Sequence, residues 1–190
     1  MARENKSRYV ILGLLAHEPM TGYSIKKKIE SSISNFYDIS YGQIYPELAR
    51  LEEQGLVVMK EDTNENGIVR KVYSITVDGH GQLQDWIAKP VEEEKIHYDI
   101  LLKLFFGGQI SVGENIEHIK AFRDRAATKL EMFEEFEATL RILLGESVDH
   151  AYYLLTVMFG KKAYKAYLEW ADYAIDYLSE HKNKRGGCCE

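Results

Sequence analysis

The sequence predicts a mainly α-helical protein with two domains and a tail. A winged helix-turn-helix domain is expected over residues 1–90, an α-helical dimerisation domain over residues 91–182, and a disordered tail over residues 183–190. Residues 39–75 predict the first domain, because a helix-like segment is followed by two short segments rich in Val, Ile and Tyr around a turn. Long segments with apolar residues at helical spacing, and a change of charge after Pro90, predict the second.

Two helices are expected before that segment. The first spans about residues 6–17 and is ended by Pro19, because the residue before a proline disfavours the helical conformation. Thr21 is a suitable N-cap for the second helix, which spans about residues 22–32. The outer face of this helix carries Lys26, Lys27 and Lys28. A lysine run is ordinarily a solvated face, and the alternative is that these ammonium groups lie near phosphates.

The third helix begins where polar and aromatic residues are concentrated. Ser40 and Gln43 have the spacing of a capping box. Pro46 conflicts with a regular helix, because it lacks an N–H group and its ring crowds the carbonyl four residues earlier. We expect a tightened, irregular first turn, with a helix start near Tyr45 as the alternative. Both versions leave Tyr41, Gln43 and Tyr45 near the helix N-terminus, where the dipole and free N–H groups favour phosphate.

Two strands and a fourth helix follow. Gly55 is expected to end the third helix. Strands are predicted over residues 56–61 and 69–76, with a turn at Asn66-Gly67, because both of these residues tolerate positive φ. Thr76 is expected to cap a fourth helix.

Three helices are expected in the second half. An apolar helix over residues 95–106 precedes a long helix that begins with a capping box at Ser111 and Glu114 and ends at Gly145. A final helix over residues 149–181 would be roughly 50 Å long at ~1.5 Å per residue. It is apolar on more than one face, and two or three helices of one chain cannot cover so wide a surface. A second copy of the chain is therefore the expected partner, in a homodimer.

The charge distribution limits any nucleic-acid-binding surface to a local patch. The formal net charge is −6. Residues 1–90 carry 11 basic and 12 acidic side chains, whereas residues 91–190 carry 13 and 18. Because the whole chain is acidic, binding to double-stranded DNA would depend on a small region of the near-neutral first half.

Several kinds of site and location are disfavoured. The apolar runs are too short to cross a bilayer and the N-terminus lacks a secretory-signal pattern, so a cytoplasmic location and no membrane partner are expected. Cys188 and Cys189 stand alone near the end of the chain, which fits neither a disulfide framework nor a closed zinc site. The six histidines are scattered and no catalytic constellation is recognisable, so we expect no enzyme, no metal and no other cofactor.

A helix followed by a wing fits the grooves of duplex DNA. Gln can pair with adenine, and Tyr can donate a hydrogen bond to phosphate. The residues expected to contact DNA are Lys6, Arg8, Lys26, Lys27, Tyr41, Gln43, Tyr45, Arg50, Arg70 and Lys71. For Tyr41 and Tyr45 the alternative is packing beneath the start of the helix. A symmetric dimer further predicts a pseudo-palindromic operator.

Several motifs of the first half occur together in one known family. They are the heptapeptide GQIYPEL at residues 42–48, Gly55-Leu56-Val57, the segment Tyr9 to Leu15, Thr21-Gly22-Tyr23, and Tyr73 to Thr76 followed by Gly81 and Trp86. In combination they resemble the PadR family of bacterial transcriptional regulators. Residues 167–170 and the helix around them are similar to the longer C-terminal type of that family. The resemblance implies a homodimer with two winged helix-turn-helix domains, which represses nearby genes until a small molecule, a phenolic acid in the founding members, relieves repression.

Aromatic residues of the last helix are the candidate effector site. Tyr153, Tyr167 and Trp170 could stack on a planar ligand, and His97 or Arg123 could hold a carboxylate. The alternative is that these aromatic residues only pack the dimer. For the whole protein, the alternative is a winged-helix dimer that acts as a protein-interaction adaptor without specific DNA binding, because wings also occur in protein contacts and the chain is acidic.

Overall fold

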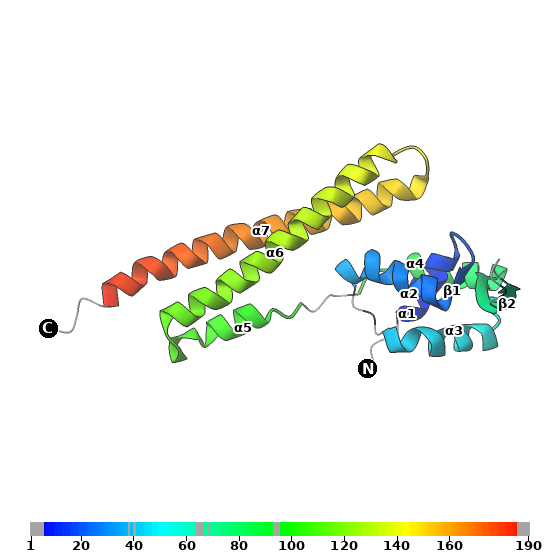
Figure 1. Ribbon diagram of the computed structural model, residues 1–190, viewed down its shortest axis with the longest axis horizontal. Coiled ribbons are helices and arrows are strands. Elements are labelled where there is room, and N and C mark those ends of the chain that lie inside the picture. The colour runs from blue at the N-terminus through cyan, green and yellow to red at the C-terminus, as the bar shows by residue number, and fades with distance from the viewer. Residues whose placement is uncertain are drawn as a thin grey trace. The chain divides into compact units, whose positions relative to one another are not determined.

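The computed structural model describes residues 6–37, 39, 41–63, 67, 69–92 and 96–185. The chain divides into two compact units, residues 1–93 and 94–190. The first unit, which we call the reading unit, contains helices α1 to α4 and a small sheet, and the second, the helical unit, contains α5 to α7 (Figure 1). The predicted class is confirmed: the protein is mainly helical, with an N-terminal winged helix-turn-helix and long C-terminal helices.

The first two helices of the reading unit lie where the sequence predicts them. They are α1 (Ser7–Leu15) and α2 (Gly22–Ser31). The Thr21 hydroxyl accepts a hydrogen bond from the Ser24 N–H at 3.1 Å, which confirms the predicted N-cap. A short 3-10 turn, η1 (Ile33–Asn35), follows α2.

The start of the third helix, α3 (Ile44–Glu53), is tightened as predicted. A 3-10 turn, η2 (Tyr41–Gln43), runs directly into it. Pro46 is therefore the third residue of the α-helix, where a missing N–H removes no intrahelical α-type bond. Gln43 is the residue before the helix and its side chain makes no N-cap bond to α3, which does not test its predicted pairing with Ser40 in a capping box. Ser40, the other half of that capping box, lies outside the described residues.

The end of α3 is closed by glycine. Gly55 has a φ of 71°, in the left-handed region that only glycine adopts readily. The Gly55 N–H donates to the Glu52 carbonyl and the Leu56 N–H to the Leu51 carbonyl, each at 2.9 Å. This bond pair closes a helix C-terminus when the residue after the cap is left-handed, and it directs the chain into the wing.

The wing is part of a three-stranded sheet. Strands β2 (Val57–Thr63) and β3 (Val69–Ile75) pair antiparallel, from Val57 opposite Ile75 to Thr63 opposite Val69. A third strand, β1 (Met20–Thr21), pairs with the other edge of β3 and was not predicted, because two residues carry no periodicity. In the predicted turn, Gly67 has a φ of 76°, whereas Asn66 lies outside the described residues.

One apolar core joins the elements of the reading unit. After β3, Thr76 caps helix α4 (Val77–Ile87) by accepting a hydrogen bond from the Gly79 N–H at 3.1 Å. Tyr9 of α1 stacks on Trp86 of α4, with ring centroids 4.5 Å apart. The most fully buried side chains of the reading unit are Ile11, Leu12, Ile25, Ile29, Ile44, Leu48, Leu51 and Val57. The inward face of α3 is thus held by α1, α2 and the sheet, which leaves its other face exposed.

The helical unit is dominated by two long helices, α6 (Val112–Ile142) and α7 (Val148–Arg185), which run antiparallel beside each other (Figure 1). The predicted capping box at Ser111 and Glu114 is present, with both hydrogen bonds formed. Gly160 of α7 lies directly against the Phe133 ring of α6, where a Cβ atom would come within 2.5 Å of that ring. None of the helices in the described ranges is long and apolar enough to cross a bilayer.

Three predicted boundaries in the helical unit are wrong. Helix α5 spans only Asp99–Phe105, rather than residues 95–106, and Tyr98 before it is extended, with φ −114° and ψ 106°. Helix α6 ends at Ile142, three residues before Gly145. Helix α7 continues to Arg185, three residues into the predicted tail, because its last residues favour helix and no Gly or Pro interrupts them before Gly186.

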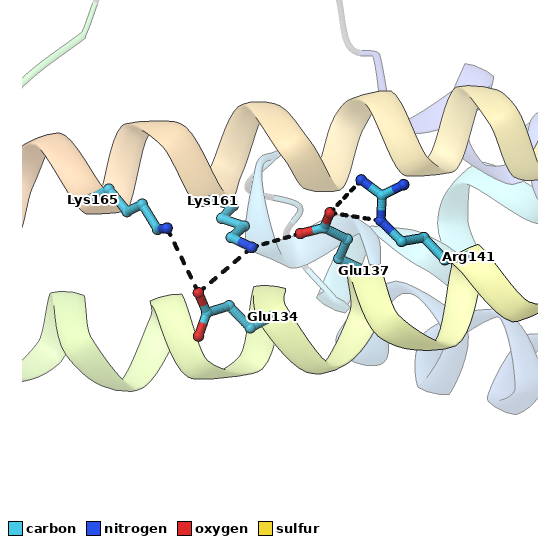
Figure 2. Close-up of polar contacts among 5 residues, drawn as sticks. All are labelled: Glu134, Glu137, Arg141, Lys161 and Lys165. Atoms are coloured by element: carbon cyan, nitrogen blue, oxygen red, sulfur yellow. Dashed lines mark hydrogen bonds and ion pairs between the residues drawn. The ribbon is translucent and has the colours of Figure 1, made fainter.

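Ion pairs connect α6 to α7 near the middle of α7 (Figure 2). The Glu137 carboxylate accepts hydrogen bonds from the Lys161 ammonium at 2.7 Å and from Arg141 Nε at 2.8 Å. Glu134 lies 3.6 Å from Lys161 and 3.9 Å from Lys165. The hydrogen bonds from Lys161 and Arg141 hold the pKa of Glu137 below its usual value.

Candidate nucleic-acid interface

The exposed residues at the start of α3 alternate with buried ones. Tyr41 and Tyr45 are 38% and 59% exposed, and Gln43 is also exposed. Ile44 and Leu48 point into the core. Two phenol rings and one amide are therefore presented together at the N-terminal end of this helix, where unpaired backbone N–H groups also lie.

The Tyr45 ring is positioned by Gly22 at the start of α2. A Cβ atom at Gly22 would lie 2.5 Å from Tyr45 Cε1, so the ring rests on the backbone where a side chain is missing. The ring is nevertheless 59% exposed. Tyr45 therefore packs against α2 and remains accessible to a ligand, so the two roles considered for it are compatible.

Helix α2 contributes cations to the same region. The Lys26 ammonium lies 5.6 Å from the centroid of the Tyr41 ring and 3.7 Å from the Glu30 carboxylate. Lys27 is exposed. Tyr23, on the same helix beside Gly22, is 68% exposed and was not among the predicted contact residues. Its signal in the sequence was a large aromatic residue at a position that the helical periodicity places outside the core.

Three other predicted contact residues have partners within the reading unit. Arg8 donates a hydrogen bond to the Gln54 side chain at the end of α3, and its guanidinium carbon lies 5.8 Å from the centroid of the Tyr9 ring. Lys6 pairs with Glu92 at 3.4 Å. Arg50 pairs with Glu47 at 3.3 Å, and its side chain remains 64% exposed. Arg8 and Lys6 therefore have structural contacts, while Arg50 keeps most of its surface for a ligand.

The charges of the wing are balanced across its strands. Arg70 lies 3.2 Å from Asp62, its partner in the β2–β3 register. The register also sets Lys71 opposite Glu61. An exposed pair of this kind contributes little to stability, so Arg70 can exchange Asp62 for a phosphate at low cost.

The structure does not gather the five candidate effector residues into one site. Tyr167 and Trp170 both contact Phe122, with ring centroids 5.8 Å and 5.6 Å from it. Tyr153 lies 14 residues earlier on α7, about 20 Å away along the helix axis. It contacts His150 instead.

The two groups expected to hold a carboxylate differ in their surroundings. Arg123 Nε lies 2.6 Å from Asp172 Oδ1 in a half-exposed ion pair. His97 is exposed in the segment before α5. Within the described residues no cluster of three or more His, Cys, Asp or Glu side chains could hold a metal ion.

Two aromatic residues that the sequence analysis missed complete the cluster around Tyr167. The Tyr98 and Tyr167 hydroxyls are hydrogen-bonded at 2.6 Å. Phe122 lies between Tyr167 and Trp170 on the facing helix. Burial, together with the hydrogen bond to Tyr98, raises the pKa of Tyr167 to about 12. Tyr98 was missed because the segment around it was predicted to be helical.

The reading unit and its exposed helix start define a winged helix-turn-helix, DNA-binding transcriptional regulator. Residues 11–85 match the model of the transcriptional regulator PadR-like family. Residues 96–179 match the model of the virulence activator alpha C-terminal region. These matches make the chain a PadR-like transcriptional regulator with a C-terminal region of the virulence activator type, which is a class of regulators rather than of enzymes.

A characterised relative has the same organisation. The negative transcriptional regulator PadR of Bacillus subtilis is 26% identical over 171 residues, which cover 87% of this chain and 93% of the relative. Its crystal structure in complex with operator DNA has a TM-score of 0.83 at 23% identity, covering 93% of this chain and 99% of that one. Its complex with p-coumaric acid has a TM-score of 0.72 at 23% identity, covering 90% and 94%. These structural likenesses establish the fold.

Proposed function

We propose that this regulator is a homodimeric repressor that reads a pseudo-palindromic operator and is released by a small, phenolic ligand. The observation that carries the proposal is the exposed set Tyr41, Gln43 and Tyr45 at the N-terminal end of α3. Lys26 of α2 lies beside the Tyr41 ring, and Lys27 is exposed on the same helix. Gln43 is suited to an adenine edge, and the tyrosine hydroxyls and lysines are suited to phosphates.

Exposed apolar residues of the helical unit support the homodimer. On α5, Leu102 and Phe105 are 62% and 82% exposed. On α7, Tyr152, Leu155 and Phe159 follow one another at helical spacing and are 64%, 63% and 74% exposed. Contiguous apolar surface of this kind is usually covered by a partner, and a second copy is the partner that is always present. Two-fold symmetry would then separate the half-sites by about one helical turn of DNA, ~34–36 Å, or a multiple of it.

Repression and release by a ligand rest on the relative. Bacillus subtilis PadR is a negative regulator, and its structures include complexes with operator DNA and with p-coumaric acid. The Tyr167–Phe122–Trp170 cluster supplies aromatic surface and hydroxyl groups for a similar ligand in this chain.

A mobility-shift titration on the DNA upstream of the protein's own gene, at two salt concentrations, tests the proposal. Six phosphate contacts would give a slope of about −5 in log K against log salt. Gln43→Ala should reduce discrimination against a changed base pair by ~1–3 kcal/mol. Tyr41→Ala should weaken binding to all sequences. Tyr173→Ala, which removes an exposed tyrosine from the helical unit, is the matched control.

Operator affinity that is unchanged in both variants would contradict the proposed reading surface. Binding without any salt dependence would favour the protein-interaction adaptor. Addition of p-coumaric acid to the wild-type complex tests separately whether a phenolic ligand releases the protein from its operator. Release of the DNA is expected only if a phenolic acid is the effector.

A further inference from the structure

The Tyr98 side chain belongs to an aromatic cluster although its backbone belongs to no helix. It precedes α5 in an extended conformation. Its hydroxyl is 2.6 Å from the Tyr167 hydroxyl, and the two rings meet edge to face with centroids 5.8 Å apart. These partners are 69 residues apart in the chain. The contact therefore joins the first segment of the helical unit to the middle of α7.

The surroundings of Tyr167 are those that a free phenol would need. Its ring contacts Phe122 at 5.8 Å and Tyr164 at 5.3 Å, in tilted and edge-to-face arrangements. Such arrangements are favoured between aromatic rings. The Tyr167 hydroxyl adds one polar group to these apolar walls. A few polar groups among aromatic walls are typical of sites for small ligands. We call Phe122, Tyr164 and Tyr167 the phenol seat.

The protonation of Tyr167 suits a neutral phenol partner. Burial is the main cause that raises its pKa to about 12, and the Tyr98 hydrogen bond adds to it. The hydroxyl therefore keeps its proton at neutral pH, so it can either donate to or accept from another phenol hydroxyl. A phenol that replaced Tyr98 would restore the same single hydrogen bond.

The segment that carries Tyr98 is lightly attached. Ile100 is the one residue of α5 that is buried, and it forms a small core with Ile119 and Ala171. The other side of α5 exposes Leu101, Leu102 and Phe105. A helix of seven residues is not stable by itself, so within one chain its position depends on Ile100 and on Leu104, which packs against the same small core. A second copy that covers the exposed side of α5 would not contact this inward side. Tyr98 can therefore leave the phenol seat without unfolding α6 or α7.

We propose that the phenol seat is a binding site for a free phenol and that the Tyr98 side chain is its tethered occupant. An incoming phenol takes the place of the Tyr98 ring at the Tyr167 ring and replaces its hydroxyl as the hydrogen-bond partner of Tyr167, beside the Phe122 and Tyr164 rings that contact Tyr167. Tyr98, the residue that would be displaced, lies four residues after residue 94, where the second unit begins in the sequence. The inference rests on the proposed function in that a small phenol is the ligand expected there.

A tethered occupant weakens the binding of a free ligand by competition. The effective concentration of a group held by a short tether is typically millimolar or higher. Tyr98→Ala removes this competitor and leaves a vacancy of the size of the tyrosine side chain. We expect p-cresol, which is that side chain as a free molecule, to bind Tyr98→Ala on the order of tenfold tighter than the wild type.

Isothermal titration calorimetry with p-cresol and toluene tests the competition between Tyr98 and a free phenol. It is carried out on the full chain, after circular dichroism has verified the helix content of each variant. In Tyr98→Ala, p-cresol should bind about fivefold or more tightly than toluene, because only p-cresol can pair with the Tyr167 hydroxyl. The preference should disappear when Tyr167→Phe is added. Tyr173→Ala, which truncates an exposed tyrosine on the same helix, should bind p-cresol as the wild type does.

Tyr98→Phe provides a second test that leaves the ring in place. It removes only the internal hydroxyl, so p-cresol should bind a few-fold tighter than to the wild type. Equal p-cresol affinity in the wild type, Tyr98→Phe and Tyr98→Ala would overturn the inference. So would equal affinity of p-cresol and toluene for Tyr98→Ala. If p-cresol binds Tyr98→Ala as expected while p-coumaric acid leaves wild-type operator binding unchanged, the two claims separate. Phenol binding at the phenol seat is then supported, and the proposed release from DNA by a phenolic ligand is contradicted.

Discussion

At the scale of single residues, a glycine of α2 determines how closely a tyrosine of α3 approaches that helix. Gly22 lacks the Cβ atom that would collide with the Tyr45 ring. The absence of one methyl group thus sets the position of an exposed aromatic side chain on a different helix. Gly13 of α1 is different, because a Cβ atom there would meet nothing within 4 Å.

Gly22→Ala is therefore expected to weaken operator binding while leaving the fold intact. The added methyl must push the Tyr45 ring aside, which is a small cost at an exposed side chain but moves a proposed DNA contact. We expect a loss of operator affinity of about fivefold to thirtyfold, or ~1–2 kcal/mol, similar to a single lost contact. Fluorescence anisotropy with operator DNA measures the affinity, and thermal unfolding measures stability.

Gly13→Ala is the matched control for this change. It should leave operator affinity unchanged and raise stability by ~0.5–1 kcal/mol, because alanine is favoured over glycine inside a helix. If Gly22→Ala bound the operator as well as Gly13→Ala does, the position of the Tyr45 ring would have no role in DNA recognition.

At the scale of elements, one glycine also decides how α4 meets the wing. A Cβ atom at Gly79 would collide with the Leu56 carbonyl oxygen and lie 2.7 Å from Ile75 Cγ1. The Thr76 N–H donates to the same carbonyl at 3.0 Å. The first turn of α4 is therefore packed directly on the backbone at the start of β2.

Gly79→Ala should destabilise the reading unit, because a backbone carbonyl cannot move aside as a side chain can. We expect a loss of ~1–3 kcal/mol in the free energy of unfolding, as for other overpacked sites. Gly81→Ala, two residues later on α4 with nothing within 4 Å of its Cβ position, should instead be neutral or stabilising. Urea denaturation of the two variants decides between these outcomes, and equal stability would rule out the close packing.

The pairing of α6 with α7 depends on charge as well as on apolar contacts. Glu137 is 13% exposed and joins Lys161 of α7 to Arg141 of its own helix. Hydrogen bonds from Lys161 and Arg141 lower its pKa from the ordinary value of 4.5. A carboxyl group with a lowered pKa in the folded state stabilises the protein above its unfolded pKa, and this contribution is lost as the pH falls through the folded value.

Glu137→Gln should therefore lower the melting temperature at pH 7, and the difference from the wild type should shrink as the pH falls below about 4.5. Differential scanning calorimetry between pH 3 and pH 7 follows this difference. Glu131→Gln removes the same charge from an exposed position on α6 and should change the melting temperature little. A Glu137→Gln effect that stayed constant over this pH range would contradict the role of its ionised form.

At the scale of the whole molecule, the exposed apolar face of α7 requires an explanation that one chain does not supply. Leu155 and Phe159 lie four residues apart and are both more than half exposed. Leu154 and Val157, on the same two turns of the helix, are buried. Helix α7 thus presents one apolar face inward and another outward, which is the pattern of a helix that packs on two sides.

Leu155→Lys combined with Phe159→Lys should dissociate the proposed dimer. Two ammonium groups cannot be buried in an apolar interface without partners. Sedimentation equilibrium should then give the mass of one chain, and operator affinity should fall because each monomer reaches one half-site only. Ile87→Lys, at an exposed apolar position of α4, is the control and should remain dimeric. A double variant with the wild-type mass would place the interface elsewhere.

Local sequence patterns predicted much of this protein, because helices, caps and hairpin strands depend on neighbours a few residues away. Thr21, Thr76 and Ser111 were recognisable as caps, and Gly55 as a helix end, from such neighbours alone. The buried face of α3 followed from helical periodicity. The family was recognisable for a related reason, since its motif is a contiguous run of residues.

The tertiary structure decided which of the predicted residues have partners of their own. Arg8 is bonded to Gln54, 46 residues later, and Tyr98 to Tyr167, 69 residues later. Strand β1 exists only because β3 lies beside it. These contacts are set by the packing of whole elements, and no short-range pattern encodes them. The sequence by itself therefore determined the elements and the class of regulator, whereas the fold determined which side chains remain available to DNA and to a ligand.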